Sequence, residues 1–266
     1  RSSDLTGYQN TANGYLSLYS NTTGWFNTAY GEQSMFGNSV GNGNTAVGYR
    51  SLYANSFGGI NTAVGGVALN SNSSGGANVA IGYSALLTNN NGSYNTSIGA
   101  WSLNFNTSGY SNVAVGTHSL YSNTNRSNLV AVGDSALYNN GNGATYEFES
   151  IMNTAIGSKA LYSNEKGSCN TANGFQSLFF NINGNYNTAI GYRSLFKNSS
   201  GGYNTANGYD ALYYNITGIY NTSNGAYSLT SNTTGNYNTG NGANSLKKIK
   251  TEALIKPKVL VPLVAI

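Results

Sequence analysis

Small, apolar and polar positions recur along this chain with a period of 17 residues. A leucine follows four residues after each of fourteen glycines, with Met35 as the one substitute. A small residue (Ala, Ser or Gly) stands two residues before each of these glycines. One interval, from Gly133 to Gly157, is 24 residues long, so it holds an insertion of 7 residues (24 − 17). The glycines are Gly14, Gly31, Gly48, Gly65, Gly82, Gly99, Gly116, Gly133, Gly157, Gly174, Gly191, Gly208, Gly225 and Gly242.

Within each copy the pattern predicts short strands separated by turns. Segments such as TAVG and SLYAN alternate over a few residues and are bounded by Gly- and Asn-rich stretches, and no helical period is present. A repeated unit of fixed length with this pattern is typical of a solenoid. We therefore expect an all-β fold, a parallel β-solenoid (β-roll) of about fourteen 17-residue coils, each with two short strands and two turns. At about 4.8 Å per coil the rod would be roughly 65 Å long.

The repeated columns have structural explanations. We expect leucine to fill the interior, the small residue to lie where two walls approach closely, and the glycine to supply a positive φ or a close backbone approach. Asparagine opens each copy, with Leu129 as the exception, and a second asparagine follows three residues after the leucine in the first thirteen copies, from Asn21 to Asn232. Stacked asparagine side chains can hydrogen-bond along the axis, which predicts asparagine ladders.

The repeats end near Leu246, and the rest of the chain has a different composition. Residues 1–246 form the predicted solenoid domain, with the insertion within 139–153. Residues 1–246 carry seven basic and seven acidic side chains, so the net charge of +4 lies in residues 247–266, with five lysines and Glu252. Without a basic stripe on the repeats, nucleic-acid binding is not expected. The longest apolar runs are too short for a transmembrane helix.

Residues 247–266 have two interpretations. This tail caps the last coil, or it pairs with a neighbouring subunit by strand addition. Its apolar end supplies candidate self-assembly residues: Val259, Leu260, Val261, Leu263, Val264 and Ile266.

A second set of self-assembly candidates lies inside the repeats. The residue before each glycine is apolar in the middle of the chain and is often asparagine toward the ends. If the small residue before it points inward, alternation turns this column outward and makes it an interface; if not, the column belongs to the core. The candidates are Val47, Val64, Ile81, Ile98, Val115 and Val132.

Two further columns could bind a partner. Tyrosines in the residue after the leucine are candidates for stacking against sugars, although a structural aromatic stack is the alternative: Tyr19, Tyr53, Tyr121, Tyr138, Tyr162 and Tyr213. A threonine column, interrupted by Val79, Val113 and Val130, leaves an ice-binding solenoid as a minor alternative.

The sequence offers little for catalysis. One histidine, His118, and one cysteine, Cys169, cannot build a triad or a zinc site. Cys169 occupies a repeat position that is tyrosine in later copies. Glu147 and Glu149 lie in the insertion and are interpreted as solvated charges. We expect no enzyme activity, no catalytic residue, no cofactor and no metal site.

The units NTAVGYRSL (residues 44–52) and NVAIGYSAL (residues 78–86) resemble the head repeats of trimeric autotransporter adhesins. The longer unit TANGYLSLYSNTTG (residues 11–24) is similar to repeats of bacterial surface proteins and phage tail-fibre-like proteins. The resemblance implies a left-handed parallel β-roll, often trimeric, displayed outside the cell.

Together, these observations predict a structural, self-associating subunit of an extracellular fibre or surface appendage, with a role in adhesion. It would be located at the cell surface, outside the cell or on a virion fibre. Its partners would be other copies of itself, as a homopolymer or homotrimer, and surface glycans. The alternative is a discrete monomeric or trimeric adhesin or tail-fibre segment that recognises a host or a glycan.

Overall fold

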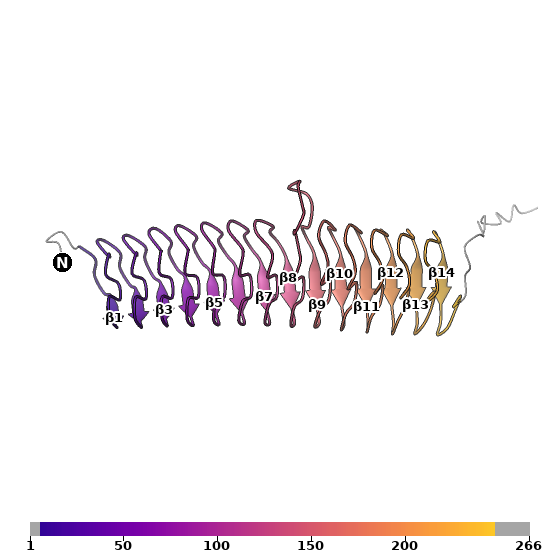
Figure 1. Ribbon diagram of the computed structural model, residues 1–266, viewed down its shortest axis with the longest axis horizontal. Helices are drawn as coiled ribbons and strands as arrows, with labels where there is room; N and C mark the ends of the chain where they lie inside the picture. Colours follow the sequence, from indigo (N-terminus) through magenta and orange to yellow (C-terminus); the bar gives the residue numbers. More distant parts are fainter. Residues whose placement is uncertain (1–5, 248–266) are drawn as a thin grey trace, which may run out of the picture.

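The computed structural model describes residues 6–247, which form one rod of stacked coils (Figure 1). Each coil contributes one three-residue strand, and the fourteen strands form a single parallel sheet in which neighbours in sequence are neighbours in space. The register repeats from coil to coil, so that Ala46 pairs with Ala63 and Val47 with Val64. The predicted parallel β-solenoid is confirmed. The strands are Thr11–Asn13 (β1), Thr28–Tyr30 (β2), Thr45–Val47 (β3), Thr62–Val64 (β4), Val79–Ile81 (β5), Thr96–Ile98 (β6), Val113–Val115 (β7), Val130–Val132 (β8), Thr154–Ile156 (β9), Thr171–Asn173 (β10), Thr188–Ile190 (β11), Thr205–Asn207 (β12), Thr222–Asn224 (β13) and Thr239–Asn241 (β14).

The prediction of two strands per coil is wrong, because the segment that includes the leucine is not extended. In the third coil Arg50 and Leu52 both have left-handed backbone conformations, with φ of 49° and 50°. A strand requires strongly negative φ at every residue. The segment is still tied to its neighbours, because the Leu52 N–H donates to the Ala68 carbonyl (2.9 Å) and the Arg50 N–H to the Glu32 carbonyl (3.0 Å).

The left-handed leucines build the interior. Leu52, Leu69 and their equivalents up to Leu229 are buried, and so are strand alanines such as Ala46 and Ala63, whereas Leu246 of the last coil is 45% exposed. A left-handed conformation costs a non-glycine residue roughly 1–2 kcal/mol, while burial of a leucine side chain contributes about 1.5–3 kcal/mol. The conformation is therefore sustained by packing, coil after coil.

The glycine that follows each strand is required by its neighbour. Gly48 has φ of 132°, outside the left-handed region that other residues occasionally adopt. A Cβ atom there would lie 2.6 Å from the carbonyl oxygen of Gly65 in the next coil. Each strand therefore ends at a corner that accepts glycine alone.

Two columns of buried asparagines run along the rod. In the first column, which opens each coil, the Asn61 backbone N–H donates to Asn44 Oδ1 (2.9 Å). In the second column, Asn72 Nδ2 donates to Asn55 Oδ1 (2.8 Å). Both columns converge on one atom, because Asn61 Nδ2 and Asn72 Nδ2 each donate to the Gly75 carbonyl at 2.9 Å. The predicted asparagine ladders are confirmed, and the shared carbonyl joins them.

The insertion lies between β8 and β9, where it projects from the rod (Figure 1). Residues 141–149 separate Asn140 of the second column from Ser150, whereas two residues fill this gap in ordinary coils. We call residues 141–149 the insertion loop. Both columns change here: Leu129 takes an asparagine position, and the buried Asn123 Oδ1 has no hydrogen-bond partner in the described part of the chain.

Loss of a second-column asparagine should destabilise the rod. Asn72→Ala would leave Asn55 Oδ1 without its ladder donor and Asn89 Nδ2 without its ladder acceptor, both in a buried environment. We expect a decrease of about 2 kcal/mol or more in the free energy of unfolding, measured by urea denaturation. Ser71→Ala, at the exposed neighbouring position, is the matched control and should change stability by less than about 0.5 kcal/mol. Equal effects of the two substitutions would contradict the assignment.

Candidate functional surfaces

The column that precedes the glycines faces outward, which decides between the two predicted orientations. In the strands of this region the middle residue is fully buried and its two neighbours point to solvent. Val47, Ile98 and Ile156 expose 37%, 37% and 42% of their surface, while Val64, Val115 and Val132 are half-buried among their neighbours. We call the outward side chains of seven consecutive coils the apolar stripe: Val47, Val64, Ile81, Ile98, Val115, Val132 and Ile156.

The whole outer face of the sheet is uncharged. The fourteen strands contain only Thr, Ala, Val, Ile, Asn, Ser, Tyr and Gly. The threonine column lies on this same face, beside the apolar stripe, because strand residues one and three point the same way. The six apolar candidates of the tail, Val259 to Ile266, lie outside the described residues.

The tyrosine column predicted as a binding surface is a stack of rings. Tyr121, Tyr138, Tyr162, Phe179, Phe196 and Tyr213 follow one another with centroids 5.0–5.4 Å apart. Tyr19 and Tyr53 flank Phe36 in a second, shorter stack. Burial raises the pKa of the Tyr138 and Tyr213 phenols. Each inner ring has both faces covered by neighbouring rings, so a partner would meet ring edges and hydroxyls.

His118 belongs to an aromatic cluster beside the ring stack. Its imidazole stacks on Trp101 (5.1 Å between centroids) and meets Tyr121 edge-on (5.3 Å). Within residues 6–247 no group of three or more His, Cys, Asp or Glu side chains is placed to hold a metal ion.

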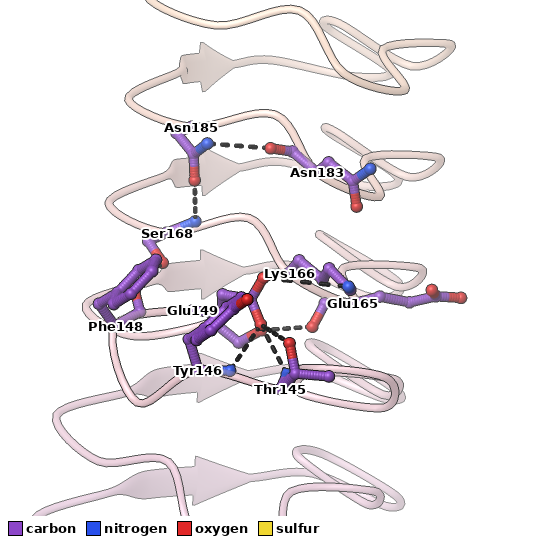
Figure 2. A network of polar contacts seen from close by, with 10 residues as sticks. Thr145, Tyr146, Phe148, Glu149, Glu165, Lys166, Ser168, Asn183 and Asn185 are labelled. Atoms are coloured by element: carbon purple, nitrogen blue, oxygen red, sulfur yellow. Dashed lines mark hydrogen bonds and ion pairs between the residues drawn. The ribbon is translucent and has the colours of Figure 1, made fainter.

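The interpretation of Glu149 as a solvated charge is wrong. Glu149 Oε2 accepts hydrogen bonds from the backbone N–H groups of Thr145 (2.6 Å) and Tyr146 (3.0 Å), as Figure 2 shows. Its other oxygen lies 3.9 Å from Lys166 Nζ. These backbone hydrogen bonds, Tyr146 first, and the charge of Lys166 lower the pKa of the Glu149 carboxyl below its ordinary value. Glu149 therefore organises the insertion loop, whereas Glu147 is exposed.

A groove of about 590 Å³ lies beside the insertion loop, and sequence reasoning missed it. Its lining combines the loop residues Phe148 and Glu149 with side chains of three consecutive coils, among them Ser168, Cys169, Asn185 and Tyr186. Two signals were present in the sequence: the 7-residue insertion, and Cys169 in a column that later holds tyrosine. Neither signal shows that the loop folds toward that column, which depends on its internal hydrogen bonds.

Comparisons with known proteins give no relative. No protein-family model, no curated protein and no solved structure matches this chain. In the part of the chain that the structure describes, no helix is long and apolar enough to cross a membrane.

The Glu149 contacts predict a pH-dependent insertion loop. The Glu149 carboxyl has a lower pKa in the folded loop than in the unfolded chain, where its pKa is about 4.3. The ionised carboxylate therefore stabilises the loop at pH values above about 4.3. This contribution should be lost as pH falls through the lower folded-state pKa. The amide resonances of Thr145 and Tyr146, followed by NMR between pH 7 and pH 2, should shift with a midpoint below about 4.3.

Two variants test the assignment of this transition. Glu149→Gln should abolish it, and Glu147→Gln should leave it unchanged. A midpoint that stays in Glu149→Gln would show that another group controls the loop.

Proposed function

We propose that this protein is a structural, non-catalytic subunit that self-associates in an extracellular fibre or surface appendage with a role in adhesion. The observation that carries the proposal is the apolar stripe on an uncharged sheet face. Large apolar side chains on seven consecutive coils form a continuous line, and contiguous apolar patches on soluble proteins commonly mark interaction sites.

The composition of the sheet face supports contact between copies. Interface cores are depleted in charged residues, and none of the fourteen strands carries a charged side chain. At about 4.8 Å per coil the stripe extends for roughly 29 Å from the first to the last of its seven coils. A straight stripe along the axis suits side-by-side packing of rods with parallel axes, in a homotrimer or a larger homopolymer.

The extracellular and adhesive parts of the proposal have separate support. The units at residues 44–52 and 78–86 resemble the head repeats of trimeric autotransporter adhesins in the order of small residue, aliphatic residue and glycine. The rod also presents rings at its surface, including the exposed Tyr203, Tyr220 and Tyr237. Tyrosine supplies a large contact area at low entropic cost, which suits recognition of a partner or glycan.

Ice binding remains a second candidate for the same face. Thr45, Thr62 and Thr96 point outward beside the apolar stripe, at the constant spacing of the sheet. The two functions exclude each other on one molecule at one time, because packing against another copy would cover the threonines. A thermal-hysteresis measurement on the isolated rod would separate them.

A charge in the apolar stripe should prevent self-association. Ile98→Asp places a carboxylate at the centre of the stripe, where it would be desolvated in the assembly but exposed in the monomer. We expect the wild-type chain to sediment as a trimer or larger species and Ile98→Asp to sediment as a monomer. Circular dichroism should be unchanged, because Ile98 is not a core residue.

Phe57→Asp is the matched control for this experiment. Phe57 is an exposed aromatic residue in a turn outside the strands, so its replacement should leave the sedimentation coefficient of the assembly unchanged. A monomeric wild-type chain, or an Ile98→Asp assembly of wild-type mass, would refute the proposal. Filaments lost when the chain is ended at Leu246 would indicate that the tail, and not the stripe, joins the copies.

A further inference from the structure

The groove beside the insertion loop is lined jointly by the loop and by the neighbouring coils. The insertion loop contributes one wall with Phe148 and Glu149, and three consecutive coils contribute the other lining residues. Its volume of about 590 Å³ lies within the range of about 300–1,000 Å³ that is usual for small-molecule sites. Elsewhere the repeat offers the same surface many times, but this combination of loop and coils occurs once in residues 6–247.

The groove exists because a tyrosine ladder stops at Cys169. Tyr186, Tyr203, Tyr220 and Tyr237 occupy one column and stack with centroids 4.8–5.1 Å apart. Tyr186 stacks on Tyr203, and on its other side the column continues with the much smaller Cys169. Tyr186 is 54% exposed and lines the groove. The end of the ladder therefore offers an uncovered ring face.

The wall formed by the insertion loop carries a second ring. Phe148 of the insertion loop is 69% exposed and also lines the groove. Its carbonyl accepts a hydrogen bond from Ser168 Oγ (2.9 Å), and its ring stacks on Tyr146 (5.3 Å). The hydrogen bonds from the Thr145 and Tyr146 N–H groups to Glu149 fix the turn that carries both rings. The wall is thus formed before any ligand binds, which lowers the entropic cost of binding.

The polar groups of the groove are oriented and balanced in charge. Asn185 Oδ1 accepts from the Ser168 N–H (2.7 Å), and Asn185 Nδ2 donates to the Asn183 carbonyl (3.0 Å). The Asn183 side chain is exposed at the rim. Glu149 and Lys166 are the charged residues of the lining, and they pair with each other, so the lining has no net charge.

We propose that this groove binds a short neutral oligosaccharide. A pyranose ring has an apolar C–H face and an edge of hydroxyl groups, so it needs an aromatic face together with amide, hydroxyl and carboxylate partners. Tyr186 and Phe148 supply the ring faces, and Asn183, Asn185 and Glu149 supply the polar partners. The balanced charge favours a neutral ligand over an anionic or cationic one. This inference does not depend on self-association through the apolar stripe.

The substitution Cys169→Tyr tests the site without removing anything from the fold. Tyrosine occupies the same left-handed backbone position in the next four coils, and φ is 59° at Cys169 and 57° at Tyr186. The added ring should extend the ladder, cover Tyr186 and fill the groove. Tyr186→Ala removes the ring face directly. Tyr220→Ala removes an equivalent ring two coils away and is the matched control.

The 266-residue chain and the three variants would be titrated by calorimetry with cello-, malto-, laminari-, manno- and chitotetraose. We expect saturable binding of at least one tetrasaccharide by the wild type. Binding should weaken by about tenfold or more in Cys169→Tyr and Tyr186→Ala and by less than about twofold in Tyr220→Ala. Since Cys169 is the one cysteine of the chain, the bound sugar should also slow its alkylation by iodoacetamide.

Two results would overturn the inference. One is no binding of any of the five tetrasaccharides. The other is binding that Cys169→Tyr leaves unchanged, which would place the sugar elsewhere. Sedimentation of Cys169→Tyr should match the wild type in either case, so failure of this site is distinguishable from failure of the proposed assembly.

Discussion

The hydrogen bonds of buried asparagine side chains are the constraint on which the rod depends. A buried amide is costly unless its donors and acceptor are paired, and here each pairing requires the next coil at the right height and register. The Gly75 carbonyl, which accepts from both Asn61 and Asn72, shows how closely the two columns are coupled. A Cβ at Gly58, the equivalent glycine one coil earlier, would lie 2.6 Å from Asn72 Nδ2. The asparagine side chains thus leave no room for a Cβ atom at Gly58, which explains why this position is glycine.

The insertion shows what happens when that rule is relaxed. Arg126 occupies a position that is glycine in most coils, and its carbonyl still accepts from Asn112 and Asn123 (2.9 and 3.1 Å). Its side chain is buried next to Gly141, where a Cβ would lie 3.2 Å from Arg126 Cγ. A larger side chain at this position needs room in the following coil, and the extra residues provide it. Arg126 and the insertion loop are therefore best understood as one change.

Sequence alone was sufficient for the columns and insufficient for the path of the chain between them. The leucines, alanines, glycines and asparagines could be assigned to core, wall, corner and ladder because each position is sampled fourteen times. The left-handed conformation of Leu52 could not be predicted, since leucine intrinsically disfavours it and packing alone sustains it. For the same reason the second strand was wrongly expected. The apolar stripe needed one further fact, the inward direction of Ala46. The groove needed the folded conformation of residues 141–149, which occurs once and has no repeat to reveal it.

The asparagine columns also give the rod a direction, with a consequence for symmetry. In the second column each bond between side chains runs from Nδ2 of one coil to Oδ1 of the coil before it, as from Asn89 to Asn72 and from Asn72 to Asn55. A twofold axis perpendicular to the rod would reverse this sense between two copies. A rotation axis along the rod preserves it. Two rods joined end to end could continue one asparagine column only if the last coil of one rod meets the first coil of the other. If two like ends met, Nδ2 donors would face Nδ2 donors, or Oδ1 acceptors would face Oδ1 acceptors. Any end-to-end junction that continues the asparagine columns would therefore require all rods to point the same way, whatever their number.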